Sequence, residues 1–226
     1  MPRLCKKLDK VSNWLMLLPL ILGGVWFSVL EQTMRSPEHF MYTPMDDWIP
    51  FVPVFVIPYV LWYFYTIIPA VFLFFRSKDA FRRIAIFLSA GMCIACLVYT
   101  ILPNGQFLRP HVLGTDWCSR LIGYLYLKDT PFNSAPSIHV IYSMGSTYAI
   151  LAYNKDVDKR LYRILSVLTW TFTGTICLST LFVKQHSVID MVTGLGVGFL
   201  LYALIYKELY KKMPRPSYMR RRRTAA

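Results

Sequence analysis

Residues 184–209 read KQHSVIDMVTGLGVGFLLYALIYKEL, and this stretch decides how the chain is interpreted. It begins with polar residues and continues as an apolar run long enough to cross a membrane as a helix, for which about 20 residues suffice. If the helix begins at His186, Asp190 lies on the same face one turn later. Gly194 and Gly198 continue that face and let another helix approach closely. The sequence therefore predicts that His186 and Asp190 point into a helical bundle.

The composition places the rest of the chain in a membrane as well. Of the 226 residues, 55% are hydrophobic and only 16% are charged, which is too apolar for an ordinary soluble domain. We expect an all-α integral membrane protein whose six transmembrane helices form one bundle, with residues 1–226 as a single domain. The expected spans are residues 12–31, 53–75, 80–103, 136–154, 160–183 and 186–209.

Basic residues alternate between loops and predict the orientation, because cytoplasmic segments carry the excess of Lys and Arg. Basic clusters lie before residue 12, between residues 76 and 83, between residues 155 and 163, and in the tail 207–226. We therefore expect both termini in the cytoplasm, any active site on the extracytoplasmic face, and the plasma membrane as the location. The basic start also resembles a signal peptide, but the length of the run favours a retained span.

The net charge of +13 follows mostly from this asymmetry and from the run Arg220 to Arg223 in the tail. A basic segment beside a membrane typically binds anionic lipid headgroups. Nucleic acid is the weaker interpretation, because no soluble domain is present to contact bases. We expect membrane lipids as partners of the tail and no nucleic acid.

The two outer loops predict different structures. The segment 42–48 combines turn residues with two aspartates and a tryptophan, which predicts a solvated turn at the membrane interface. The loop 111–135 is too long to be a simple connection, and we expect it to act as a lid or a substrate-entry element.

Three polar clusters are expected at the same outer end of the bundle: Arg109-Pro110, residues 136–139 and residues 184–190. Pro136 suits the first position of a helix, which would leave the amides of Ser137, Ile138 and His139 open to an anion. Each cluster also has an ordinary interpretation, such as an interfacial anchor for Arg109. Their convergence nevertheless favours a functional site.

These clusters resemble the signature of the type 2 phosphatidic acid phosphatase superfamily of membrane lipid phosphatases and phosphotransferases. That signature is a lysine, six residues and Arg-Pro; then Pro-Ser-Gly-His; then Ser-Arg, five residues, His, three residues and Asp. The chain offers Arg109-Pro110, then Pro136 to His139, then Ser179-Thr180 followed by His186 and Asp190. The resemblance extends from the third expected span to the end of the chain.

Three positions depart from that signature. Leu102 replaces the lysine, Ile138 the glycine and Thr180 an arginine, so two phosphate-binding cations of the family are missing. Lys184 follows Thr180 by four residues. If the helix continues that far, Lys184 returns to the same face, and we expect it to restore one positive charge.

The resemblance implies a role for each matching residue. His186 would be the nucleophile, Asp190 would orient it, and His139 would act as general acid and base. Arg109, Ser137, Ile138 and Lys184 would hold the phosphate oxygens. No cofactor and no metal are implied, because no clustered carboxylates or His/Cys ligand spacing is present.

The resulting expectation is a lipid phosphatase. It would hydrolyse the phosphomonoester or pyrophosphate of a lipid, phosphatidate-like or polyprenyl, through a phosphohistidine. Two alternatives remain open from the sequence. One is a phosphotransferase that moves a phosphorylated head group to an alcohol, as sphingolipid synthases do. The other is a non-catalytic transporter or binding protein with six spans.

Overall fold

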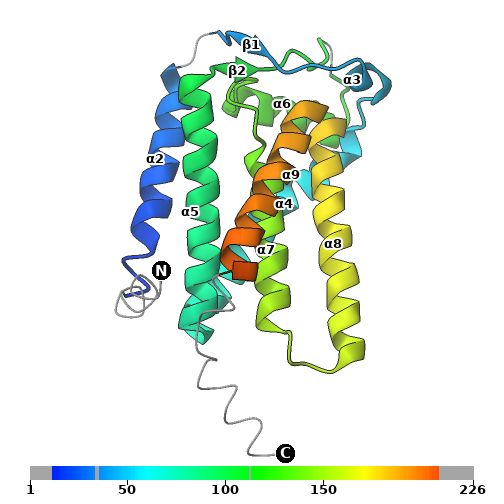
Figure 1. The fold of residues 1–226 in the computed structure, drawn as a ribbon. Coiled ribbons are helices and arrows are strands. Elements are labelled where there is room, and N and C mark those ends of the chain that lie inside the picture. Colours follow the sequence, from blue (N-terminus) through cyan, green and yellow to red (C-terminus); the bar gives the residue numbers. More distant parts are fainter. Residues whose placement is uncertain (1–11, 34–35, 112, 209–226) are drawn as a thin grey trace, which may run out of the picture.

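The computed structural model describes residues 12–33, 36–111 and 113–208, and in this part of the chain the fold is mostly helical (Figure 1). Six long helices run along the bundle: α2 (Leu17–Thr33), α4 (Val56–Arg76), α5 (Lys78–Ile101), α7 (Ile138–Tyr153), α8 (Lys159–Phe182) and α9 (Val188–Tyr202). The π-helix η2 (Ala203–Glu208) continues α9. The expectation of an all-α fold is confirmed at this level.

Four of these helical segments are long and apolar enough to cross a membrane: Pro53–Arg76, Lys78–Ile101, Lys159–Phe182 and Val188–Lys207. Helix α2 is apolar but has only 17 residues, and α7 has 16. At 1.5 Å per residue both are shorter than a bilayer core of about 30 Å. Six spans and the sides of the termini therefore stay predictions, and the basic tail beyond residue 208 lies outside the described residues.

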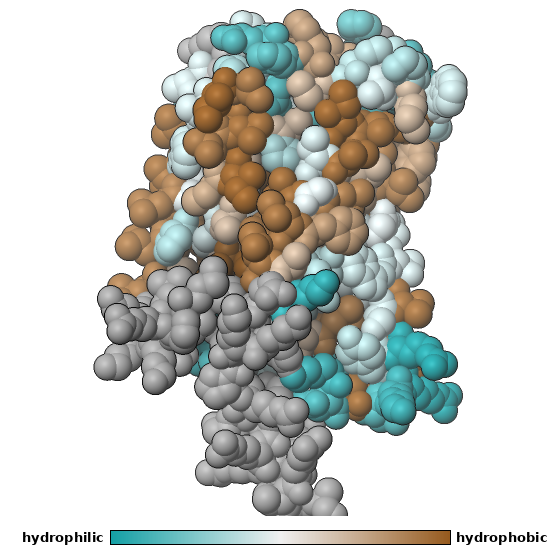
Figure 2. Space-filling model, in the orientation of Figure 1, coloured by the Kyte–Doolittle hydropathy of each residue, from teal (hydrophilic) through white to brown (hydrophobic). Residues whose placement is uncertain are grey.

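The surface of the bundle is apolar along its length. On the face drawn in Figure 2, hydrophobic residues cover much of the helices, whereas hydrophilic residues gather at the two ends. Large apolar side chains such as Phe75, Ile101 and Val167 are exposed on the helices. This distribution is what a protein surrounded by lipid requires, because the hydrocarbon core solvates apolar side chains.

Helix α7 lies at the centre and packs against α4, α5, α8 and α9. Its sequence suits that place because it carries small polar residues, and Ser143, Ser146 and Thr147 are all fully buried. The Thr147 hydroxyl lies 2.7 Å from that of Thr173 in α8 and 2.6 Å from that of Tyr65 in α4. These hydrogen bonds satisfy polar groups that lipid cannot solvate.

Helices α7 and α9 approach each other at the two glycines singled out in the sequence. A Cβ atom at Gly194 would lie 2.9 Å from the backbone oxygen of Ser137. One at Gly198 would overlap the sulfur of Met144, whereas one at Gly196 would meet nothing within 4 Å. The prediction that these glycines admit a close neighbour is confirmed, and the neighbour is α7.

One end of the bundle is covered by short elements: η1 (Pro53–Phe55), α3 (Met45–Trp48), α6 (Trp117–Lys128) and the parallel strands β1 (His39–Phe40) and β2 (Asn104–Gly105). Helix α6 forms within the long loop because Asp116 caps it, accepting a 3.0 Å hydrogen bond from the Ser119 amide. Its residue Ile122 is fully buried, whereas Leu127 is exposed. The expected lid region thus contains an amphipathic helix.

The prediction of a solvated turn at residues 42–48 is wrong for Asp46, although Tyr42, Met45 and Trp48 are exposed. Asp46 is only 1% exposed and accepts hydrogen bonds from the amides of Thr43, at 2.7 Å, and Val188, at 2.8 Å. Because Val188 is the first residue of α9, this buried carboxylate attaches α3 to the start of that helix. Trp48 remains largely exposed, as an interfacial tryptophan would be.

Candidate active site

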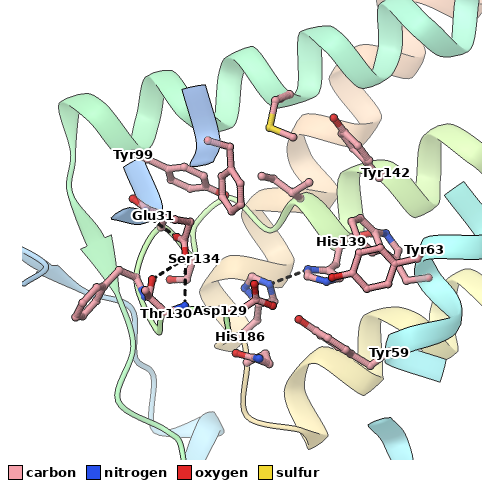
Figure 3. A pocket seen from close by; sticks show the side chains of 17 residues that line it. Glu31, Tyr59, Tyr63, Tyr99, Asp129, Thr130, Ser134, His139, Tyr142 and His186 are labelled. Atoms are coloured by element: carbon pink, nitrogen blue, oxygen red, sulfur yellow. Dashed lines mark hydrogen bonds between the residues drawn. The ribbon is translucent and has the colours of Figure 1, made fainter. Parts of the chain in front are cut away.

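Two histidines and an aspartate meet at the covered end of the bundle. Nδ1 of His186 lies 3.2 Å from Oδ2 of Asp190. Its Nε2 lies 3.3 Å from Nδ1 of His139, and Figure 3 shows these two rings facing each other. His186 precedes α9, which begins at Val188, so the expectation that the helix includes His186 is wrong. The predicted pairing with Asp190 is nevertheless present, because the chain turns directly into the helix there.

Asp190 is fully buried, and its carboxylate contacts both the cap of α9 and the ring of His186. It is the third residue of α9, and its Oδ2 accepts a 2.9 Å hydrogen bond from the amide of the cap residue Ser187. The Ser187 hydroxyl in turn accepts from the Asp190 amide, which completes a capping box. The same oxygen faces Nδ1 of His186, so the fold of the helix start fixes the ring and leaves Nε2 directed at His139.

His139 lies in the first turn of α7 between two aromatic side chains of α4. Its ring centroid is 4.6 Å from that of Tyr59 and 4.2 Å from that of Trp62. The Trp62 indole also donates a 3.1 Å hydrogen bond to the backbone oxygen of His139. These contacts hold the second imidazole in place beside His186.

The start of α7 differs from the prediction. The helix begins at Ile138 with Ser137 as its cap, so Pro136 precedes the helix and does not occupy its first position. The Ser137 amide donates a 3.0 Å hydrogen bond to the backbone oxygen of Asp190, and so it is not open to an anion. Ser137 is fully buried and does not line the cavity described below, whereas Ile138 does.

The segment before α7 is held by Asn104, which lies in β2 just after the end of α5. Its Oδ1 accepts from the amides of Ser134, at 3.0 Å, and Ala135, at 2.8 Å, and its Nδ2 donates to the Ala135 oxygen. Tyr99 donates from its hydroxyl to the Pro136 oxygen at 2.7 Å. No signal in one sequence distinguishes this buried asparagine from an ordinary turn residue.

Arg109 lies behind the histidine pair. Its guanidinium donates to Oε1 of Gln185 at 2.6 Å and to the backbone oxygen of Asp129 at 2.9 Å, and it stacks over the Tyr126 ring at 4.3 Å. Burial lowers the pKa of Arg109, but from an ordinary value so high that it stays charged at neutral pH. Arg109 reaches the cavity through Gln185, which lines it.

Lys184 points elsewhere. Helix α8 ends at Phe182, and Lys184 has a left-handed backbone with φ of 54°, so the expected helical continuation from Thr180 is wrong. Its Nζ donates a 2.9 Å hydrogen bond to the backbone oxygen of Asp46. Lys184 is not among the residues that line the cavity, and its expected role as a substitute phosphate-binding cation stays a prediction.

The histidine pair opens on a cavity of about 210 Å³. Its lining comprises Phe27, Glu31, Tyr59, Trp62, Tyr63, Met92, Tyr99, Asp129, Thr130, Phe132, Asn133, Ser134, Ile138, His139, Tyr142, Gln185 and His186. Aromatic rings and two carboxylates therefore surround the site. Among these described lining residues there is neither Lys nor Arg.

Glu31 is a site residue that the sequence interpretation missed. It comes from α2, and its carboxylate accepts 2.8 Å hydrogen bonds from Thr130 and Asn133. The available signal was a single carboxylate at the end of an apolar run, a position where charge is costly. Figure 3 shows Glu31 and Thr130 on one side of His186, with His139, Tyr59 and Tyr63 on the other.

Within the described ranges, no group of three or more His, Cys, Asp or Glu side chains is arranged to hold a metal ion. The expectation of metal-independent chemistry stays a prediction, to be tested with a chelator.

The fold and the site together define a helical, membrane-associated protein with a His-His-Asp centre at one end of its bundle. The family model of the PAP2 superfamily matches residues 85–214, more than half of the chain, and the protein belongs to this superfamily. The resemblance found in the three motifs is thereby confirmed. A comparison with curated proteins finds no match. Members of the superfamily are generally phosphatases, and membership indicates a phosphatase or phosphotransferase acting on lipid-like phosphates.

Proposed function

We propose that the protein is a membrane lipid phosphatase that works through a phosphohistidine at His186. The observation that carries this proposal is the position of one imidazole between two partners: Nδ1 faces Asp190, and Nε2 faces both His139 and the cavity. A carboxylate at Nδ1 keeps the proton there, so that Nε2 presents its lone pair, and it stabilises the cation that forms during attack.

The reaction has two steps. In the first, Nε2 of His186 forms a bond to phosphorus while the ester bond to the lipid oxygen breaks, and His139 gives a proton to that leaving oxygen. In the second, a water oxygen bonds to phosphorus, passes a proton to His139 and displaces His186. Acid-base assistance of this kind typically accelerates a reaction by about 10²–10⁴-fold.

Phosphate oxygens would be held by donors that have no partner in the structure. Nε2 of Gln185 is buried and makes no hydrogen bond within the described chain, and its Oε1 is fixed by Arg109. The first-turn amide of Ile138 adds a second donor, because the first amides of a helix have no intrahelical acceptor. Arg109 supplies a positive charge on the side of Gln185 that faces away from the cavity. Such preorganised donors stabilise charge in the transition state.

The same proposal places the site on the extracytoplasmic side of a membrane, with the plasma membrane as the expected location. The support is the distribution of charge, because the basic loops around residues 76–83 and 155–163 lie at the opposite end of the bundle from His139 and His186.

A phosphotransferase is the second candidate, and one observation favours it. The cavity is lined by Glu31 and Asp129 and, among the described lining residues, by no Lys or Arg. A phosphomonoester carries a charge of about −1.5 to −2 at neutral pH and suits such a cavity poorly. A phosphodiester carries less negative charge. Transfer of its phosphorylated head group to an alcohol would use the same two histidines.

The proposal is tested by measuring phosphate release from a panel of lipid phosphates by the purified protein, with a chelator and with alcohol acceptors. Release that survives chelation supports the phosphatase, and a product that appears only with an acceptor supports the transferase. No turnover with any lipid would contradict both and would favour a non-catalytic binding protein or transporter.

A further inference from the structure

We propose that Gln106 is a positioning residue for the reaction at His186. It ties the segment before α9 to the segment before α7, and it thereby holds the ring of His186 beside that of His139. Gln106 is one of the unspecified residues of the first motif and does not line the cavity. This inference rests on the proposed phosphoryl transfer and adds to it a residue that acts through the backbone of His186.

The backbone that carries His186 lies between two helices and belongs to neither. Helix α8 ends at Phe182, and α9 begins at Val188. Within this linker Lys184 has a left-handed backbone, with φ of 54°, which is unfavourable for a residue with a side chain and persists only where surrounding contacts hold it. The peptide units before His186 therefore need partners outside the two helices.

The side chain of Gln106 is a partner for two of these peptide units. Its Nε2 donates hydrogen bonds to the backbone oxygens of Lys184, at 3.0 Å, and Gln185, at 3.2 Å. The second oxygen belongs to the peptide unit that joins Gln185 to His186. One glutamine can hold two consecutive carbonyls because its amide nitrogen carries two protons. Its Oε1 accepts from the Leu108 amide, which fixes the side chain.

The backbone of Gln106 is bound to the segment that leads to α7. Its amide donates a 2.9 Å hydrogen bond to the backbone oxygen of Pro131. The neighbouring Gly105 lies so close to that segment that a Cβ atom there would be 2.9 Å from the same oxygen. Gln106 thus bridges the stretches that precede His139 and His186.

Water does not reach this bridge, because Gln106 is only 1% exposed. If Nε2 were lost, the two linker carbonyls would lose a donor in a buried place, and the linker would shift toward other donors. A shift of about 1 Å in a reacting group can lower a rate by about 10²-fold. The consequence of losing Gln106 should therefore appear in the chemical step.

The test uses two substitutions of Gln106. Gln106→Met keeps the length of the side chain without a donor, whereas Gln106→Asn keeps the amide but is too short to reach both carbonyls. With phosphatidate in detergent micelles, each should lower kcat by about 10–100-fold. KM should change by less than about threefold, because Gln106 lies outside the cavity and Arg109 still holds the side chain of Gln185. A raised KM with unchanged kcat, or full kcat in Gln106→Asn, would overturn the inference.

Thr147→Val is the matched control for stability. The Thr147 hydroxyl is also fully buried and bonded, to Thr173 at 2.7 Å, but it lies about 12 Å further along α7 than His139, at 1.5 Å per residue. This variant should lower the thermal midpoint and change kcat by less than about twofold. A loss of kcat as large as in the Gln106 variants would assign their effect to general destabilisation and would overturn the inference.

A structural measurement separates this inference from the proposed function. The chain has four histidines, so protein labelled with ¹³C and ¹⁵N at histidine alone gives few ring signals in solid-state NMR. The rings of His139 and His186, with centroids 5.3 Å apart, should give a cross-peak in the unaltered protein and in Thr147→Val. This cross-peak should weaken in both Gln106 variants.

Weakening that is confined to the Gln106 variants supports the positioning role and, if no lipid is turned over, counts only against the catalytic proposal. A cross-peak of full intensity in both Gln106 variants would overturn the inference and leave the histidine chemistry standing.

Discussion

Nε2 of His186 lies 3.3 Å from Nδ1 of His139, although the two residues are 47 positions apart. Their proximity follows from the packing of the helix starts that carry them. The Ser137 amide donates to the backbone oxygen of Asp190, and Gly194 removes the side chain that would separate the two helices. The distance between the two imidazole rings is thus set by the close approach of α7 and α9.

Replacing His139 with alanine should remove acid-base assistance and lower turnover by about 10²–10⁴-fold, while folding is retained. Turnover of a lipid phosphate and the thermal midpoint of the purified variant check this prediction. His39→Ala is the matched control, because His39 is an exposed histidine on β1 at the same end of the bundle and does not line the cavity. A loss smaller than tenfold would remove His139 from the mechanism.

Variants of Asp190 and Ser187 distinguish the proposed orientation of His186 by Asp190 from the stability of the start of α9. Both variants, Asp190→Asn and Ser187→Ala, break the capping box and should each destabilise the protein by about 0.5–2 kcal/mol. Only Asp190→Asn also changes the partner of His186, so its turnover should fall by at least about 100-fold more than that of Ser187→Ala. Equal losses of turnover in the two variants would mean that Asp190 acts only as a cap.

Lys184→Met should alter stability more than phosphate binding. The lysine donates to the backbone oxygen of Asp46, and loss of a hydrogen bond to a charged group costs about 1–3 kcal/mol. Arg109→Met provides the contrast, since Arg109 holds Gln185 at the cavity and its loss should weaken inhibition by inorganic phosphate. If Lys184→Met weakened that inhibition as much as Arg109→Met, the lysine would belong to the phosphate site after all.

Replacing each glycine of α9 with alanine should change the stability of the protein to a different extent. Gly194→Ala should destabilise the protein by about 1–3 kcal/mol and lower turnover, because the new Cβ meets the backbone oxygen of Ser137. Gly198→Ala should cost less, since the atom that it meets belongs to the flexible side chain of Met144. Gly196→Ala faces open space and should be neutral or slightly stabilising. The order of thermal midpoints across the three variants tests whether helix contact sets the site.

Much of this architecture follows from local sequence patterns. Apolar runs predicted the helices, and the spacing of Asp190, Gly194 and Gly198 predicted which face of α9 is buried. The motifs predicted that His139 and His186 lie at the same end of the bundle. These features were predictable because helical periodicity and the cost of buried charge act over a few residues.

The remaining site residues depend on contacts between distant segments. Glu31, Asn104 and Asp129 come from three parts of the chain, and only packing brings them to the start of α7 or to the cavity. The position of Lys184 depended on where α8 ends, because the helix stops two residues before the lysine and the side chain then turns toward α3. A boundary shift of that size is beyond what helix propensity can specify.

The covalent intermediate tests the central claim most directly. A lipid labelled with ³²P at the transferred phosphorus is mixed briefly with the protein, the reaction is quenched in alkali, and peptides are mapped by mass spectrometry. The account predicts an acid-labile phosphorus adduct on Nε2 of His186 that accumulates in His139→Ala and is absent from His186→Asn. Turnover that continues in His186→Asn, or an adduct on any other residue, would contradict it.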